Sequence, residues 1–274
     1  MSGQWLTAIY SLLTCFGGGT LAFLGISEGA RLAPKTRKAA AVAAALLLLA
    51  GGCVFVLTVG KPAGVMAMAV NAIHGSPKSL EFVAAVLCFV AAVVYLIVAF
   101  RSDEESSAPR IVGIVGLVLG VLMGVAAGYS MAVGRADWNN IVLPVAYLGS
   151  AVAMGGSLFA SLMAVLREEA PDFRKVALIS LIGAVIQAIG FVVFGALTGF
   201  AVDALLYWVG AIAVGTVVPL ICLAASPKAR ALVFASLICS VAGALCLRAV
   251  VLAMGTTSLG LIANAASRSP ILAG

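Results

Sequence analysis

The sequence predicts an all-α integral membrane protein, a bundle of eight transmembrane helices with both termini extracytoplasmic. Three observations support this prediction: of 274 residues, 64% are hydrophobic and only 9% are charged, and the mean hydropathy is +1.21. A soluble domain carries roughly a quarter charged residues. A chain this apolar cannot cover itself with polar surface, which excludes a soluble protein with a large core.

Eight apolar runs are long enough to cross the hydrocarbon core, which takes about 20 helical residues. Short connections separate the runs, and charge or Pro marks most of them. The first run has neither a cationic start nor a small-residue cleavage site before it, so we expect a retained span and not a leader peptide. Residues 1–274 are expected to form a single membrane domain with spans at 5–27, 38–59, 80–100, 110–133, 141–166, 175–199, 204–225 and 230–254.

The Lys and Arg residues predict the orientation, because cytoplasmic loops of membrane proteins carry an excess of both. Most of the 16 cationic residues fall in the connections after the first, third, fifth and seventh spans. The opposite side holds Lys61, Lys78, Arg135 and Arg268, and Arg248 lies within a span. The basic connections are therefore predicted to be cytoplasmic. The pI of 9.2 then reflects membrane topology, and we expect no nucleic-acid binding.

Polar residues that are costly to place in lipid are the candidates for a site. Arg248 lies about 9 Å from the outer end of its span, where an arginine either faces a bundle interior or snorkels to the interface. Glu81 opens the third span and Thr58 closes the second, near the same membrane face. Their plain structural alternatives are a first-turn carboxylate for Glu81 and a capping or back-bonded hydroxyl for Thr58. We expect Glu28 to be solvated and Gln187 to join helices.

Haem and metal are not expected in this chain. A haem held by two axial His needs a second imidazole, and His74 is the one His in the sequence. All six Cys lie in apolar runs without a CxxC pair, so they lack the clustering of a zinc or iron–sulfur site. His74 lies in a predicted outer loop, either as a plain loop residue or in a proton-handling role.

One outer segment carries a resemblance to a known family. It reads TVGKPAGVMAMAVNAIHGSPKSLEF, residues 58–82, and resembles a pattern in the membrane-anchor subunit of dimethyl sulfoxide reductase, within the polysulfide-reductase-like membrane subunit superfamily. Gly60 and Pro62 match the Leu-Gly-x-Pro part, Asn71 lies in the linker, and Glu81 ends a Ser-x-x-Ser-x-Glu part. The likeness continues in WLTAIYSLLTCFGGGTLAFLGI, in DWNNIVLPVAYLGSAVAMGGSLFASL and in AGALCLRAVVLAMGTTSLG.

The resemblance implies a multi-pass anchor in the bacterial cytoplasmic membrane, part of a molybdenum/iron–sulfur oxidoreductase of anaerobic respiration. Such a subunit binds and oxidises menaquinol near the outer membrane face. It passes the electrons to a ferredoxin-like four-cluster iron–sulfur subunit, which serves a molybdenum bis-guanine-dinucleotide catalytic subunit. The anchor itself uses no haem and does not act on the terminal substrate.

The family's carboxylate maps to Glu81, expected to be catalytic, and its last-span arginine maps to Arg248. The family's His falls at Thr58 and its Arg after the Pro falls at Gly64. Because Thr cannot take a proton at neutral pH, three alternatives stay open: Glu81 removes the proton alone, His74 takes part, or the chain binds quinol poorly. A small-molecule or ion transporter and a structural anchor without quinol chemistry are the alternative functions. The expected quinol-binding residues are Glu81, Arg248, Thr58, His74, Gly60 and Pro62.

Overall fold

The computed structural model describes residues 2–59, 76–101, 106–133, 141–197 and 205–268, with side chains described within 5–252. These residues form helices and no strand. Eight helical segments are long and apolar enough to cross a membrane, which confirms the predicted number of spans. The elements are α1 (Ser2–Gly29), α2 (Pro34–Val59), α4 (Pro77–Arg101), α5 (Ala108–Ala132), α6 (Val142–Val165), α7 (Ala170–Leu197), the π-helix η2 (Leu205–Val217), α8 (Val218–Ala225) and α9 (Leu232–Arg268).

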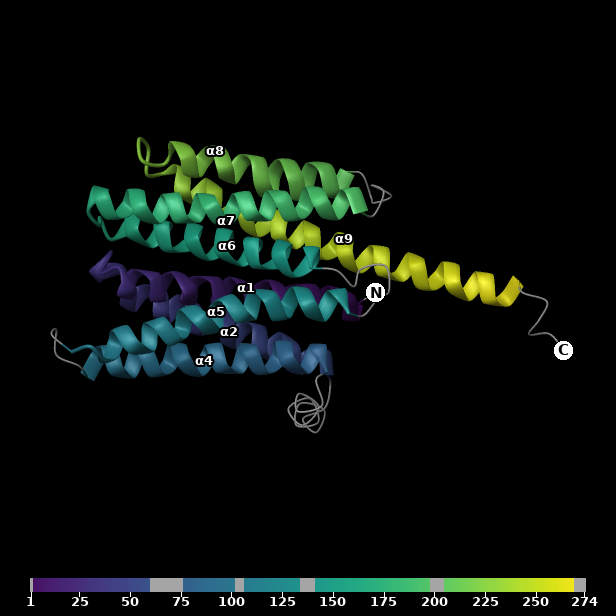
Figure 1. Ribbon diagram of the computed structural model, residues 1–274, viewed down its shortest axis with the longest axis horizontal. Coiled ribbons are helices and arrows are strands. Elements are labelled where there is room, and N and C mark those ends of the chain that lie inside the picture. The colour runs from purple at the N-terminus through teal and green to yellow at the C-terminus, as the bar shows by residue number, and fades with distance from the viewer. Residues whose placement is uncertain (1, 60–75, 102–105, 134–140, 198–204, 269–274) are drawn as a thin grey trace.

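Helix α1 is the centre of the bundle. In its most apolar 18-residue window 83% of the residues are buried, against 67% or less in every other span. It packs against α2 and α5 on one side and against α6 on the other (Figure 1). A Cβ atom at Gly19 would overlap the backbone of Ala151, so glycine lets α1 and α6 approach this closely.

The seventh span was predicted at residues 204–225, and the structure divides this segment into η2 and α8. Pro219 lacks the N–H that would bond the carbonyl of Gly215 in an α-helix. The Nε2 atom of Gln187 donates to that carbonyl instead, at 3.0 Å. Gln187 is fully buried, so the prediction that it joins helices is confirmed. The Gln187 amide therefore supplies the hydrogen bond that the backbone of the seventh span lacks at Gly215.

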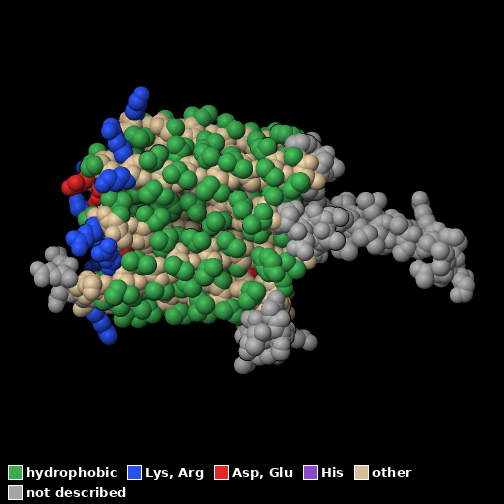
Figure 2. All heavy atoms as spheres, viewed as in Figure 1, with side chains coloured by type: hydrophobic (Ala, Val, Ile, Leu, Met, Phe, Trp, Pro, Cys, Tyr) green, Lys and Arg blue, Asp and Glu red, His purple; other side chains and the backbone are tan. Residues whose placement is uncertain are grey.

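The two ends of the bundle differ in charge. Lys and Arg side chains gather at the end where α1 finishes and α2 begins, and apolar side chains cover the sides (Figure 2). Large apolar residues such as Leu46, Phe100 and Ile238 are more than half exposed on these sides. This is the surface of a protein whose sides contact hydrocarbon and not water. Helix α1 begins at the opposite, less charged end, and α4 also begins there (Figure 1).

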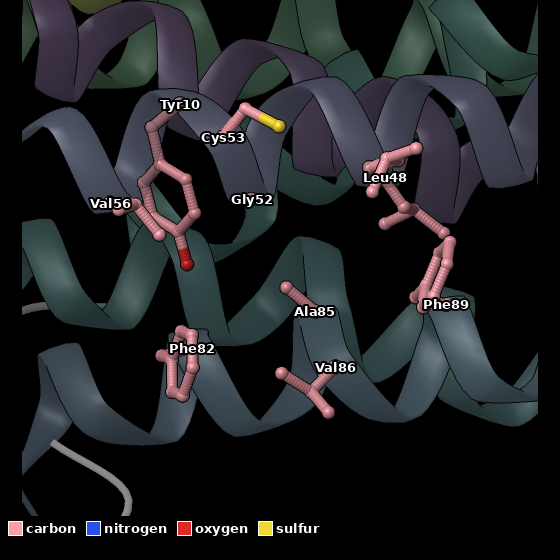
Figure 3. A pocket seen from close by; sticks show the side chains of 10 residues that line it. Tyr10, Leu48, Gly52, Cys53, Val56, Phe82, Ala85, Val86 and Phe89 are labelled. Carbon is pink, nitrogen blue, oxygen red and sulfur yellow. The ribbon is translucent and has the colours of Figure 1, made fainter. Parts of the chain in front are cut away.

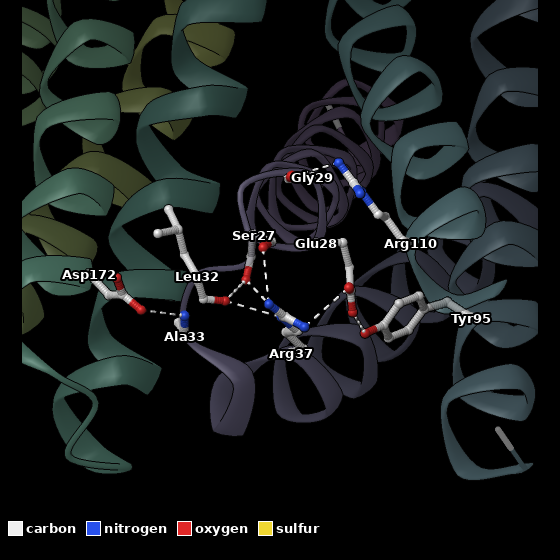
Figure 4. A network of polar contacts seen from close by, with 9 residues as sticks. All are labelled: Ser27, Glu28, Gly29, Leu32, Ala33, Arg37, Tyr95, Arg110 and Asp172. Carbon is white, nitrogen blue, oxygen red and sulfur yellow. Dashed lines mark hydrogen bonds and ion pairs between the residues drawn. The ribbon is translucent and has the colours of Figure 1, made fainter. Parts of the chain in front are cut away.

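At the basic end the prediction for Glu28 was wrong, because this carboxylate is buried and not solvated. Its Oε2 atom pairs with Nη1 of Arg37 at 3.2 Å, and its Oε1 atom accepts a 2.5 Å hydrogen bond from the Tyr95 hydroxyl. Arg37 also donates to the carbonyls of Leu32 and Ser27 (Figure 4). The network ties α1, α2 and α4 together, a partnership between distant segments that the sequence pattern did not indicate.

Candidate functional site

Glu81 lies in the first turns of α4 and is fully buried. The helix begins at Pro77, a residue that suits the first helical position because it has no N–H to leave unpaired. Lys78 and Ser130 both hold the Oε2 atom of Glu81, each at 2.6 Å. The other oxygen, Oε1, is buried and has no hydrogen-bond partner in the described part of the chain. One half of the carboxylate is therefore fixed by the protein and the other half is open to a ligand.

Arg248 lies in α9 and is 1% exposed, so it does not snorkel to the interface. Its Nη1 atom donates to the carbonyl of Ala244 at 3.0 Å, and its guanidinium lies 4.5 Å from the centroid of the Tyr147 ring. Its Nε and Nη2 atoms have no partner among the described residues. An ionisable side chain buried within a span is costly, so a guanidinium with open donors is a candidate functional group.

Glu81 and Arg248 belong to one polar region of the bundle interior. The charges of both act on the thiol of Cys15 in α1 and on the phenol of Tyr147 in α6. The charge of Glu81 also acts on Tyr10 in α1. Arg248 contacts Tyr147 directly, and Lys78 links Glu81 to the Tyr10 ring at 4.8 Å, so both predicted residues are buried in the same interior region around α1 and α6.

This region holds most of the unsatisfied polar atoms of the described residues. Six of the eight buried side-chain atoms without a hydrogen-bond partner belong to it. A folded protein leaves few buried polar groups unpaired, because each costs about 1–3 kcal/mol. A concentration of them indicates a place where a polar ligand or water completes the bonding. The six atoms are Glu81 Oε1, Arg248 Nε and Nη2, and the hydroxyls of Tyr10, Ser11 and Tyr147.

An apolar groove adjoins this polar region. It lies between α2 and α4, has a volume of about 330 Å³, and opens on the side of the bundle, where its lining residue Cys53 is exposed. Figure 3 shows the Tyr10 hydroxyl pointing into the space between the two helices, toward Phe82. Phe82 stacks on Phe55, which in turn contacts the Tyr10 ring. Tyr10 therefore connects the groove with the Glu81 region.

Of the remaining predicted site residues, Thr58 is the one that the structure describes, and it is not part of this cluster. Thr58 is exposed, and its hydroxyl donates to the carbonyl of Val54 one turn earlier in α2 at 2.9 Å. This is the back-bonded hydroxyl that was the plain structural alternative. His74, Gly60 and Pro62 lie outside the described residues. The site as described therefore rests on Glu81 and Arg248.

Sequence reasoning missed the residues that surround these two. The missed residues lie at the same end of the bundle as Glu81 and Arg248, although some are near the start and one is near the end of its helix: they are Tyr10, Lys78, Ser130 and Tyr147. A search for polar and aromatic residues at equal membrane depth would have found them. Cys15 carried no such signal, because a cysteine in an apolar run is ordinarily a small core residue.

The chemistry of the region suits a ligand with an apolar body and hydroxyl groups. The groove offers apolar and aromatic walls, while Glu81 Oε1 accepts a hydrogen bond and the free Arg248 atoms donate. No group of three or more His, Cys, Asp or Glu within the described residues could hold a metal ion.

Comparison with known proteins adds a family. The family model described as "Polysulphide reductase, NrfD" matches residues 4–260, which is nearly the whole chain. No curated protein matches the chain.

Proposed function

Because this chain belongs to the polysulphide reductase NrfD family, and is thus a membrane subunit of a redox complex, we propose that it oxidises menaquinol at the Glu81–Arg248 region. Members of this family typically work with iron–sulfur subunits. We propose a ferredoxin-like four-cluster subunit as the electron acceptor and a molybdenum bis-guanine-dinucleotide subunit as the catalytic partner. The resemblance of the 58–82 segment and of Arg248 to the dimethyl sulfoxide reductase anchor supports this assignment.

The observation that supports quinol chemistry best is the set of unpaired buried polar atoms beside an apolar groove. A quinol has an apolar ring and tail with two hydroxyls on opposite sides of the ring. The hydroxyls match Glu81 Oε1 and the free donors of Arg248, and the tail matches the walls formed by Phe82, Val86 and Phe89. Small-molecule sites generally combine such apolar walls with a few placed polar groups.

In the proposed reaction, the quinol loses two electrons and two protons and becomes a quinone. The electrons leave to the iron–sulfur partner. Glu81 Oε1 accepts the two quinol protons in turn, passing the first to the outer solution before it takes the second, while Lys78 and Ser130 hold the other carboxylate oxygen in place. Arg248 stabilises the negative charge that develops on the ring oxygen as the proton departs. Of the three alternatives for proton removal, we propose that Glu81 acts alone, because Thr58, at the position of the family's His, is exposed and its hydroxyl bonds its own helix.

The proposed site faces the outside of the cell. Lys and Arg gather at the opposite end of the bundle, and the positive-inside rule then makes that end cytoplasmic. Both termini are accordingly proposed to lie on the outer side of a bacterial cytoplasmic membrane. Protons released by Glu81 would leave toward the outer solution.

The test is Glu81→Gln in the purified complex with its partners, reconstituted in membranes and supplied with a menaquinol analogue. Gln keeps the size and the hydrogen bonds to Lys78 and Ser130 but cannot take a proton. Loss of a general base lowers a rate by about 10²- to 10⁴-fold. The readouts are the rate of iron–sulfur reduction by quinol and the amount of partner subunit that copurifies.

The matched control is Glu169→Gln, because Glu169 is an exposed carboxylate at the basic end. The control should keep the full quinol-dependent rate. A Glu81→Gln complex that assembles fully and reduces its clusters at the original rate would remove Glu81 from the reaction. Absence of quinone in the purified complex would instead favour a structural anchor, and substrate flux by the chain alone in liposomes would favour a transporter.

A further inference from the structure

A second groove lies at the basic end of the bundle, on the half opposite to the quinol region. It runs between α7 and α8 and has a volume of about 380 Å³. Its walls are apolar except for Arg174, which lies near the start of α7. The other lining residues are Ala177, Leu178, Leu181, Leu223, Ala224 and Pro227.

The groove is polar at its outer end, the mouth where Arg174 lies, and apolar along the rest of its length. Arg174, Leu178 and Leu181 follow one another at intervals of four and three residues, which places them on one face of α7. Leu181 lies seven positions after Arg174, which is about 10 Å along the helix. The cation therefore lies at the end of the bundle, and the apolar walls extend from it toward the membrane interior.

Arg174 is a cation without a partner in the described part of the chain, whereas several of its neighbours are engaged. Arg230 donates to the carbonyl of Glu168 at 2.9 Å and lies over the Phe173 ring. Lys175 lies 4.0 Å from Asp172, which itself accepts a hydrogen bond from the Ala33 N–H. The Arg174 guanidinium is left available for an external anion.

Further charge lies close to the mouth. Lys228 directly follows the lining residue Pro227 and is exposed, and Arg167 is exposed just before α7. The exposed acid nearby is Glu169. Cations thus outnumber acids around the groove, which favours an anionic headgroup over a zwitterionic one.

We propose that this groove binds one anionic phospholipid of the leaflet at the basic end, with its phosphate at Arg174 and an acyl chain against Leu178, Leu181 and Leu223. The sides of the bundle contact hydrocarbon, so a lipid reaches the groove directly from the membrane. Basic pockets between transmembrane helices hold anionic headgroups in this way. The site is independent of the quinol region and would persist if that assignment failed.

The test is native mass spectrometry of the purified full chain, titrated with phosphatidylglycerol or phosphatidylcholine of identical acyl chains. One phosphatidylglycerol should be retained in preference. Arg174→Gln should weaken its binding about fivefold, the effect of one cation near an anionic headgroup. Ala224→Trp fills the groove without changing charge, on a residue that is exposed, and should lower the retention of the lipid as well.

The control variant is Arg101→Gln, which removes an exposed cation from the same end but at the end of α4, outside the groove. It should keep full binding. Equal retention of both lipids, an equal loss with Arg101→Gln, or unchanged binding in Ala224→Trp would each overturn the proposal. Displacement of the lipid by millimolar inorganic phosphate would show a simple anion site and would overturn it too.

Discussion

Replacing Tyr10 with Phe should make the chain more stable and make the proposed quinol site bind more weakly. The Tyr10 hydroxyl is buried and has no hydrogen-bond partner among the described residues. Its ring contacts, to Phe55 at 4.9 Å and to the Lys78 ammonium at 4.8 Å, do not need the hydroxyl. The substitution therefore removes an unpaired polar atom and keeps the packing.

The two effects have opposite signs and can be sized. An unpaired buried hydroxyl costs about 1–3 kcal/mol, and 1 kcal/mol corresponds to roughly 2–4 °C in melting temperature for a protein of this size range. A neutral hydrogen bond to the quinol contributes about 0.5–1.5 kcal/mol, so its loss should raise the quinol Kd roughly two- to tenfold. A residue with a purely structural role would not improve stability and impair binding together.

The assay is thermal unfolding in detergent beside titration of the purified complex with a menaquinol analogue. Tyr207→Phe is the matched control, because the Tyr207 hydroxyl donates to the Phe191 carbonyl inside the other half of the bundle. That variant should melt at a lower temperature and bind quinol normally. The reasoning is wrong if Tyr10→Phe lowers the melting temperature and leaves the quinol Kd unchanged.

Three further substitutions test the packing of the bundle by thermal unfolding. Gln187→Leu should destabilise the chain by about 1–3 kcal/mol, because the Gly215 carbonyl loses its donor; an unchanged melting temperature would contradict this. Arg37→Gln should cost about 2–4 kcal/mol by leaving Glu28 without its cation, and a double variant with Glu28→Gln should recover part of the loss. Gly19→Ala should cost more than 1 kcal/mol because the added methyl meets the backbone of α6; wild-type stability would show that the helices can separate there.

The number of spans was predictable from the lengths of the apolar runs along the chain, and the more basic end of the bundle from the loops that carry Lys and Arg. A helix that crosses the hydrocarbon core needs about 20 consecutive apolar residues, and charged residues are favourable only near its ends. The apolar runs and the charged connections between them can therefore be read directly from the sequence. Arg248 and Glu81 were identifiable for the same reason, since each is costly to bury in a membrane. Thr58 was a candidate by its depth in the membrane and by resemblance, and its exposed, back-bonded hydroxyl shows that neither ensures a shared site.

Contacts between distant helices could not be predicted in this way. Glu28 looked like a solvated helix end until the fold placed Arg37 and Tyr95 around it. Pro219 is a local signal of irregular backbone in the seventh span, but the amide that bonds the freed Gly215 carbonyl comes from Gln187 in α7, which the local sequence does not indicate.

The sequence by itself determined that this chain is a membrane protein, how many times it crosses the membrane, and which polar side chains cost free energy to bury there. Those properties follow from the one-dimensional cost of moving residues from water into hydrocarbon. Only the tertiary structure decided that a carboxylate and a guanidinium far apart in the chain share one interior region beside an apolar groove, because that depends on how the helices rotate and pack. Lipid is equally apolar toward every face of a helix, so small residues and buried polar partners, not hydrophobicity, select which faces meet.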